Sequence, residues 1–398
     1  MTSPAISVLS NPIRPYDWGS RTAIAELLGA ESPSPGPQAE LWMGAHSGDP
    51  SVLPDGTSLE ARIAADPAGE LGERAVAAFG PRLPFLGKIL AAARPLSLQV
   101  HPTSAQARAG FAAEDAAGVA IDDPARNYKD DNHKPELICA LTPFRGLAGF
   151  RPVEQTARLF DLLAVPALRP FAAALDDGAA GLRRIVGDLL RLPAAECGPL
   201  VADVVAACRT AGPDFAAERQ CAGELNDAFP GDPGIVVALL LNLVELRPGQ
   251  ALFLPAGVPH AYLDGVGVEV MANSDNVLRG GLTSKHIDVA ELLAILDTEP
   301  GAPHVQNGVP GANGELTYPT PAREFVLSRI TGGVRLPAGS PQIVVVTDGA
   351  LSLARDGEVG DLSRGRAAYL SAAGGPVEVR GAGTGFRITT DLDAPGVA

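Results

Sequence analysis

Cysteine is scarce in this chain, and its four residues form no recognisable metal-binding pattern. Cys139, Cys197, Cys208 and Cys221 are spaced too irregularly for a zinc ribbon. The N-terminal segment also lacks the charged and apolar layout of a secretory signal peptide. We therefore expect reduced thiols and a cytoplasmic location.

Long apolar runs and an excess of positive charge are also missing. The most apolar run, 235–244, is interrupted by Asn242 and is far shorter than the ~20 residues that span a bilayer. Acidic residues number 46 and basic residues 31, so the formal net charge is −15. These features exclude a membrane span and a general affinity for nucleic acid or anionic membranes. An anionic substrate would need a local basic pocket.

Aromatic residues make up only 5% of the chain, whereas 45 Gly and 36 Pro indicate many turns. The combined Gly and Pro content remains below the ~25–30% that is typical of low-complexity disorder. A hydrophobic content of 46% is ample for globular folding, and 398 residues are too many for one simple core. Two or three domains are therefore expected.

A short stretch around His101 combines strand periodicity with possible ligands. Apolar and polar residues alternate over 96–101, so a strand here would place Ser97, Gln99 and His101 on one face. Pro102 would end the strand. The Gln and His side chains are either two ligands of a metal or an ordinary hydrogen-bonded strand face.

The residues just before this stretch predict a second strand over 84–90, separated from 96–101 by a short turn. The two segments resemble a β-hairpin with a longer loop. Antiparallel pairing would bring Lys88 near Ser97 or Gln99 on the same face. A solvated lysine at a sheet edge is the alternative.

Two later strands also carry single polar groups. Alternation after Glu136 places its carboxylate opposite an apolar face, where it needs a cation or hydrogen-bond donors. A salt bridge to Lys134 is the structural alternative. After a strand and turn within 251–263, His260 opens a late strand and shares a face with Tyr262, a pattern typical of a cupin-type β-barrel.

The rest of the chain divides into a helical part and a second β part. Helical spacing of apolar residues between proline breaks predicts helices over 153–230. Short strand segments from about residue 316, separated by Gly and Asp turns, predict a second small barrel. The residues therefore predict a mainly β fold with two barrels and an inserted helical part.

Gln99, His101, Glu136 and His260 could together hold a borderline divalent metal ion. One anionic ligand against a dication leaves a net positive charge and an open position, which suits Lewis-acid binding of substrate oxygens. The same His, Glu and His without the glutamine would fit an Fe(II) facial triad. A metal-dependent oxygenase is therefore a rival hypothesis.

The polar loop over 273–285 carries two cations, Arg279 and Lys285, around the pair Gly280–Gly281. Glycine allows the backbone to approach a ligand closely. An acidic protein does not need two cations in a glycine loop for solubility, so the loop indicates an anion-binding site.

Six stretches resemble, in chain order, the signatures of the type I mannose-6-phosphate isomerases. They are YDWG (16–19), AELWMG (39–44), LQVHP (98–102), NHKPE (132–136), LFLPAG with HAY (252–257 and 260–262) and DNVLRGGLTSK (275–285). The resemblance extends from near residue 11 to about 297 and weakens in the helical and C-terminal parts. One departure is Val258–Pro259, where relatives usually carry a polar or charged residue, and it concerns loop shape more than ligation.

The resemblance implies a zinc enzyme, with one ion per chain, that interconverts D-mannose 6-phosphate and D-fructose 6-phosphate. The implied fold has two cupin-type (jelly-roll) β-barrels and an inserted α-helical domain. The expected domains are a catalytic cupin domain in two segments, 1–152 and 233–315, a helical insertion, 153–232, and a C-terminal cupin-like domain, 316–398. The implied zinc ligands are Gln99, His101, Glu136 and His260. The implied pocket residues are Lys88, His133, Lys134, Tyr262, Glu269, Asp275, Arg279 and Lys285. We further expect a monomer that acts on a small sugar phosphate. His46, by contrast, is expected at the surface. A non-catalytic sugar-phosphate-binding protein is a second rival hypothesis.

Aldose–ketose isomerisation requires ring opening and the transfer of a proton between neighbouring carbons through an enediol. A base must lie within hydrogen-bond reach of both carbons. Lys134, Glu269 and Asp275 are candidates by residue type, and our hypothesis makes Lys134 the proton shuttle with Asp275 assisting. The other expected roles are ring opening for His133, enediolate stabilisation for Arg279, and substrate or phosphate binding for Lys285, Lys88, Ser97 and Tyr262.

Overall fold

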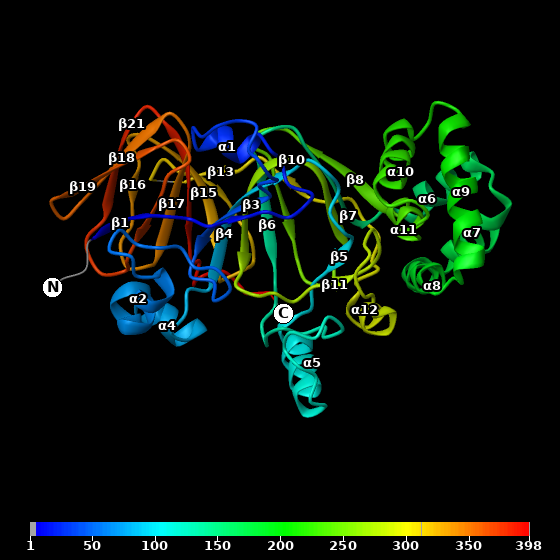
Figure 1. The fold of residues 1–398 in the computed structure, drawn as a ribbon, viewed down its shortest axis with the longest axis horizontal. Coiled ribbons are helices and arrows are strands. Elements are labelled where there is room, and N and C mark those ends of the chain that lie inside the picture. Colours follow the sequence, from blue (N-terminus) through cyan, green and yellow to red (C-terminus); the bar gives the residue numbers. More distant parts are fainter. Residues whose placement is uncertain (1–4, 312, 398) are drawn as a thin grey trace.

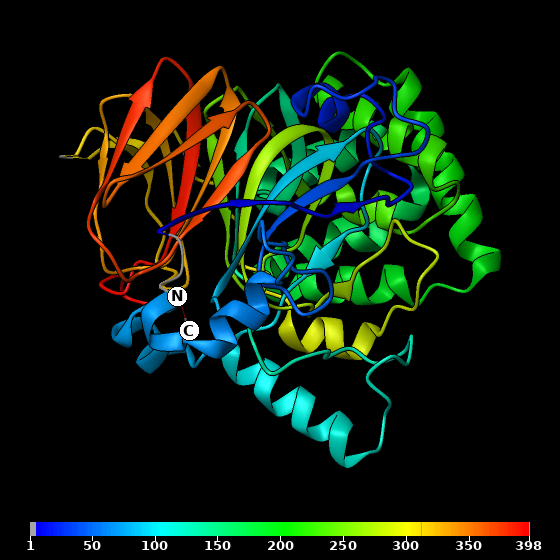
Figure 2. The same ribbon diagram turned by 60° about the vertical axis from the view of Figure 1, so that its left-hand side comes forward.

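The computed structural model describes residues 5–311 and 313–397 and combines antiparallel β-sheets with a similar amount of helix, which is more helix than the expected, mainly β fold contains. Its sheets contain eleven, seven and four strands. The C-terminal strands, orange and red in Figure 1, lie at one end of the molecule, and the green helices lie at the other end. Figure 2 shows the same arrangement after rotation, with the large sheet between the two parts.

The strands and helices have the following bounds. The strands are β1 (Ile6–Leu9), β2 (Ile13–Arg14), β3 (Glu40–Gly44), β4 (Phe85–Ala92), β5 (Gln99–Val100), β6 (Glu136–Ala140), β7 (Phe144–Phe150), β8 (Leu241–Leu246), β9 (Ala251–Leu254), β10 (His260–Ala272), β11 (Leu278–Arg279), β12 (Val305–Gln306), β13 (Val309–Pro310), β14 (Leu316–Tyr318), β15 (Val326–Thr331), β16 (Arg335–Leu336), β17 (Gln342–Asp348), β18 (Ala350–Arg355), β19 (Glu358–Ser363), β20 (Ala367–Leu370), β21 (Val377–Gly381) and β22 (Thr384–Thr389). The α-helices are α1 (Ala23–Leu27), α2 (Leu59–Ala65), α3 (Pro67–Leu71), α4 (Glu73–Phe79), α5 (Ser104–Ala116), α6 (Val153–Leu163), α7 (Arg169–Ala174), α8 (Gly178–Leu190), α9 (Ala194–Thr210), α10 (Ala216–Ala228), α11 (Gly234–Ala238) and α12 (Val289–Ile295), with short 3-10 turns at Pro166–Leu168 and Leu175–Asp177.

The eleven-stranded sheet is organised around β10, which pairs with β4, β5, β6 and β7. Strand alternation gives this sheet two different faces. On β4, Ile89 packs in a core shared with the seven-stranded sheet, whereas Lys88 points to the opposite side, toward the cavity described below. On β6, Leu137 packs in the same core and Glu136 points away from it. The predicted faces of β6 are therefore confirmed.

The C-terminal strands form the seven-stranded and four-stranded sheets, except that β1 from the other end of the chain completes one edge. Ile6 pairs with Leu370 of β20 at this edge. Side chains of Leu41, Leu327 and Tyr369 meet in one buried cluster, so the seven-stranded sheet packs against the eleven-stranded one. Residues at the start of the chain thus take part in the C-terminal β structure.

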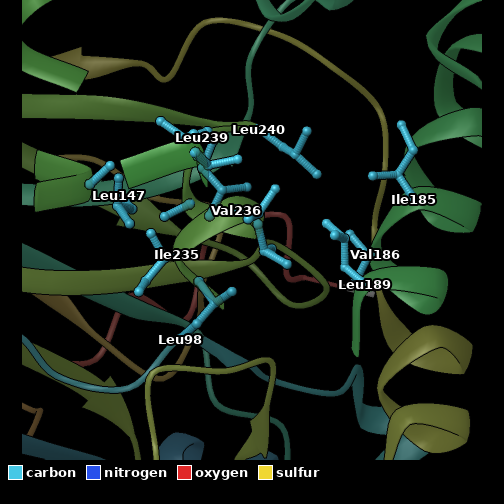
Figure 3. Close-up of a cluster of buried hydrophobic side chains, with 14 of the residues drawn as sticks. Leu98, Leu147, Ile185, Val186, Leu189, Ile235, Val236, Leu239 and Leu240 are labelled. Carbon is cyan, nitrogen blue, oxygen red and sulfur yellow. The ribbon is translucent and has the colours of Figure 1, made fainter. Parts of the chain in front are cut away.

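Helices α6–α11 lie between β7 and β8 in the sequence and pack together through apolar faces, as their periodicity predicts. Figure 3 shows Ile185, Val186 and Leu189 of α8 directed toward side chains near the large sheet, among them Leu98 and Leu240. The same buried cluster includes residues of both regions, so the helices and the sheet share a continuous core.

The predicted β-hairpin is wrong. Its first segment corresponds to β4, but of the strand predicted over 96–101 only the two residues of β5 are present, and His101 lies just beyond them. β4 pairs with β3 and β10, whereas β5 pairs with β10 and β11. The long strand β10 competes successfully for both partners, because it buries apolar residues along most of its length. The strand that was predicted to open at His260 continues through Asp264 to Ala272.

Two further predictions concern the whole chain. No helix within the described residues is long and apolar enough to cross a membrane. All four cysteines are buried and free, as expected for reduced thiols.

Candidate metal centre and active site

Three buried side chains from different strands converge on one point. His101 follows β5, Glu136 begins β6 and His260 begins β10. Their ligand-type atoms all lie within 4.8 Å of one another. His101 Nε2 is 3.3 Å from Glu136 Oε1, and His260 Nε2 is 3.4 Å from Glu136 Oε2. The structure thus brings together three of the four predicted metal ligands.

The curvature of β10 makes this convergence possible. His260 lies at one end of β10, and Met271, near the other end, pairs with Glu136. A straight strand would hold His260 and Met271 about 36 Å apart. The contact between Glu136 and His260 therefore requires a strong bend, and a register shift precedes Gly265, whose φ is +119°. Irregularities of this kind bend a strand and increase its twist.

Backbone carbonyls determine which nitrogen of each imidazole carries the proton. His101 Nδ1 is 2.7 Å from the carbonyl oxygen of Asn276, and His260 Nδ1 is 3.0 Å from that of Val258. Because a carbonyl only accepts hydrogen bonds, both Nδ1 atoms are donors, and in each neutral ring Nε2 keeps a free lone pair. These two lone pairs lie next to the Glu136 carboxylate.

The protonation states of the cluster favour a metal ion. His101 Nε2 is buried and has no hydrogen-bond partner among the described residues. Burial lowers the pKa of His101 to about 4, so its ring is neutral near pH 7. Burial opposes ionisation of Glu136, but Lys134 and the two imidazoles outweigh it and hold the pKa of Glu136 well below its usual range. Two neutral nitrogens and a carboxylate fit a cation such as zinc.

Gln99 lies in β5, two residues before His101. It pairs with both His260 and Arg279, and its side chain lines a neighbouring cavity. Its role as a fourth metal ligand stays a prediction.

The cavity beside the cluster has a volume of about 510 Å³. Its buried end includes Lys88 and Lys134, whereas Lys285 is exposed at its mouth and Arg279 is half-buried. Ser97 also lines it, as predicted. A larger cavity of about 720 Å³ lies around 299–309, but neither Gln99 nor Lys134, the two residues that connect the smaller cavity to the cluster, lines it.

A buried network of charges occupies the inner wall of the cavity. Lys88 Nζ lies 2.9 Å from Glu269 Oε2 and 3.6 Å from Glu40 Oε1. Trp42 Nε1 donates a 2.6 Å hydrogen bond to Glu40 Oε2. Burial alone would lower the pKa of Lys88, but Glu269 and Glu40 outweigh it and raise that pKa. Lys88 is therefore a cation whose charge is already matched, and we no longer assign it to the phosphate.

Three predicted pocket residues do not contribute to the lining of the cavity. The Nε2 atom of His133 is 2.7 Å from Glu324 Oε1, so this ring is directed toward the C-terminal part of the chain. The predicted ring-opening role of His133 does not agree with this geometry. Glu269 is held against Lys88, and the Tyr262 hydroxyl is buried without a hydrogen-bond partner in the described structure.

Asp275 lines the cavity from the loop after β10, and His46 holds its carboxylate. His46 Nδ1 accepts a 3.1 Å hydrogen bond from the backbone N–H of Gly48. In the neutral ring Nε2 therefore carries the proton, and it lies 3.4 Å from Asp275 Oδ1. This hydrogen bond is the largest of the effects that lower the pKa of Asp275. The expectation that His46 is a surface group is wrong, because the residue is buried.

Comparison with known proteins agrees with this site. A model of the catalytic domain of type I phosphomannose isomerases matches residues 6–153. The mannose-6-phosphate isomerase of Escherichia coli (strain K12) is 39% identical over 394 residues, which cover 96% of this chain and 99% of the relative. This chain belongs to the type I phosphomannose isomerase family. The family member from Rattus norvegicus is 32% identical and matches 94% of this chain and 95% of its own length.

Two solved structures of phosphomannose isomerases have the same fold. A crystal structure of mannose 6-phosphate isomerase with zinc bound has a TM-score of 0.90 at 38% identity and covers 98% of this chain and 100% of its own. A mutant of phosphomannose isomerase from Salmonella typhimurium has a TM-score of 0.91 at 37% identity, with the same coverage. The resemblance inferred from the sequence is therefore confirmed.

The structure adds residues to this phosphomannose isomerase site that sequence reasoning missed. Arg94, in the turn after β4, and Phe229, just after α10, both line the cavity. Phe229 belongs to the helical part, for which we predicted no site residue. Neither residue lies in a recognisable motif, so only the tertiary arrangement identifies it.

The backbone carbonyl of Asn276 accepts the hydrogen bond that orients His101. We expect Asn276→Ala to weaken zinc binding and to destabilise the fold. The Asn276 side chain donates to the carbonyls of Asp130 and Asn132, each at 2.8 Å, and accepts from the Lys129 N–H at 2.7 Å. Loss of these buried bonds should lower the free energy of unfolding by ~2–4 kcal/mol. Without these side-chain bonds, the backbone carbonyl of residue 276 would shift and would no longer orient the His101 ring. Zinc affinity should therefore fall ~10- to 100-fold.

Chemical denaturation and zinc competition titrations measure the two effects. The matched control is Asn307→Ala, at an exposed asparagine whose side chain accepts a hydrogen bond from Gln250. Unchanged zinc affinity in the Asn276 variant would show that its carbonyl does not orient His101.

Proposed function

We propose that this chain is a zinc-dependent aldose–ketose isomerase that interconverts D-mannose 6-phosphate and D-fructose 6-phosphate. The observation that carries this proposal is the buried His101–Glu136–His260 cluster beside a cavity whose mouth is cationic. The relatives named mannose-6-phosphate isomerase and the zinc-bound neighbour support the choice of metal and substrate.

We propose Gln99, His101, Glu136 and His260 as the residues that hold one zinc ion. When bound, zinc would supply Lewis-acid polarisation of the substrate's carbonyl and hydroxyl oxygens. The Nδ1 hydrogen bonds of the two imidazoles keep both Nε2 atoms available for it. Lys134 Nζ, 3.1 Å from Glu136 Oε1, balances the carboxylate when the sugar is absent.

We propose Lys134 as the proton shuttle, because it is the predicted base that lies both in the cavity and beside the metal ligands. The ion pair with Glu136 holds Lys134 as a cation, so the role as base requires that this carboxylate be bound to a metal ion instead. As a free amine, Lys134 would then take the proton from the carbon beside the carbonyl and return it to the neighbouring carbon. Asp275 also lines the cavity and can assist, whereas the position of Glu269 against Lys88 disfavours it as the base.

Arg279 is placed to stabilise the negative charge that develops on the substrate oxygens. It lies in the cavity, pairs with Gln99 through the backbone, and has no ion pair with the described carboxylates. Burial lowers the pKa of Arg279, yet a guanidinium keeps its proton in proteins. Lys285 at the mouth, with Ser97, is assigned to the phosphate.

The finer description of the fold is also a proposal. The strong bend of β10 supports a closed, cupin-type barrel around the metal centre, with the helices of 153–232 as an inserted domain. The second barrel would comprise 316–398, together with β1, which we now add because it pairs with β20. The monomeric state and the cytoplasmic location stay predictions.

A coupled assay of mannose 6-phosphate conversion tests the proposed function. We expect measurable turnover by the purified protein, loss of nearly all of it after treatment with a chelator, and recovery on addition of zinc. Metal analysis before and after chelation is the control for zinc removal. Protein that carries iron and consumes oxygen would instead indicate an oxygenase. Sugar-phosphate binding without turnover in the zinc-loaded state would indicate a binding protein.

A further inference from the structure

The mouth of the cavity holds cations that lack acidic partners. Arg94, Arg279 and Lys285 all line it, and none makes an ion pair or side-chain hydrogen bond with the described residues. Burial, followed by repulsion from Arg279, lowers the pKa of Lys285, although Asp17 opposes this. Asp17 and Asp275 are exposed and line the same cavity, so the three cations leave a net positive charge there that is smaller than their number, in a chain whose net charge is −15.

The buried end of the cavity has the opposite arrangement. Its two cations, Lys88 and Lys134, each lie within 3.1 Å of a carboxylate oxygen. A substrate with one anionic group and several hydroxyl groups matches this division of charge. Its anion would lie at the mouth, and its hydroxyl groups would lie toward the carboxylates and the metal centre.

Arg94 is held at its backbone while its side chain is free to bind. The backbone N–H groups of Ala93 and Arg94 donate to the carbonyl of Trp18 at 3.0 and 3.2 Å. Pro95 follows and restricts the turn further. The side chain is exposed, so binding an anion would not require it to leave an existing partner.

We propose that Arg94 binds the phosphoryl group of the substrate together with Lys285 and so determines the preference for phosphorylated over free hexoses. This inference rests on the proposed function. A phosphate monoester is close to a dianion at neutral pH, since its second pKa is about 6. The guanidinium offers a planar pair of donors that matches two phosphate oxygens, and Lys285 adds a point charge.

The test compares the zinc-loaded wild type with Arg94→Gln. We expect KM for mannose 6-phosphate to rise roughly 10- to 100-fold, because a charge-assisted hydrogen bond is lost. We expect kcat to stay within about twofold, since the phosphate is bound equally in the ground and transition states. Inhibition by inorganic phosphate should weaken in parallel, whereas inhibition by free D-mannose should not change. Arg94→Lys should recover part of the affinity.

Arg108→Gln is the matched control, because Arg108 is an exposed arginine on α5 that also lacks an ion pair among the described residues. Unchanged KM and phosphate inhibition in Arg94→Gln would overturn the proposal. Equal weakening toward free mannose would also overturn it, because a general distortion would then be the cause. If the wild type converts no mannose 6-phosphate, the proposed function fails, and calorimetric titration of both proteins with inorganic phosphate still tests Arg94.

Discussion

Glu136→Gln should nearly abolish both zinc binding and turnover. Glu136 is the single anion of the converging cluster and contacts both imidazoles and Lys134. Glutamine keeps the size of the side chain but removes the charge that offsets the cation. Replacing a residue that only hydrogen-bonds to a metal ligand already costs about 10- to 100-fold in metal affinity. We therefore expect at least ~100-fold weaker zinc binding and an equal or larger loss of kcat/KM.

Zinc analysis after dialysis and the coupled isomerase assay measure these two quantities. Glu245→Gln provides the matched control, since Glu245 is an exposed strand residue of the same sheet. The variant should unfold cooperatively like the wild type, which a thermal melt would verify. If Glu136→Gln retained bound zinc and normal turnover, the assignment of the metal centre would be wrong.

Lys134→Met should have the second large effect. Unlike Glu136→Gln, it should lower turnover without loss of zinc. The three converging ligands remain, so zinc content should stay close to one ion per chain. The loss of a general base should lower kcat ~10²- to 10⁴-fold. KM should change much less, because the cations at the mouth of the cavity still bind the phosphate.

Exchange of the substrate's transferred hydrogen with solvent deuterium gives an independent measure of proton transfer. It should disappear in Lys134→Met together with turnover. The control is Lys129→Met, because Lys129 lies outside the cavity and its ammonium binds backbone carbonyls. Near-normal turnover in Lys134→Met would exclude this lysine as the shuttle and would direct attention to Asp275.

Local patterns predicted much of the candidate site. The alternation in β6 placed Glu136 opposite an apolar face, and the structure confirms that Leu137 lies in the core. Alternation also drew attention to His101, although β5 ends at Val100, and a strand, turn and strand pattern drew attention to His260. The helical spacing that predicted α8 also describes a local property.

Properties that depend on distant partners were not predictable in this way. The hairpin prediction failed because strand pairing is decided by burial across the whole sheet, where β10 offers the longest apolar surface. His133 was misplaced because its partner, Glu324, lies 191 residues away. Arg94 was missed because a single arginine in a turn has no periodicity. Its significance comes from the cavity that surrounds it.

The pairing of β1 with β20 has a consequence for synthesis on the ribosome. β1 leaves the ribosome long before its partner strand, because Ile6 pairs with Leu370. At usual elongation rates, roughly 20–70 s pass before this partner exists. During that time an apolar strand has unsatisfied backbone groups that can pair with another nascent chain. A high yield of folded protein therefore requires that β1 does not pair with another chain during this time. A chaperone can prevent such pairing, and so can the short length of β1, which offers few backbone groups.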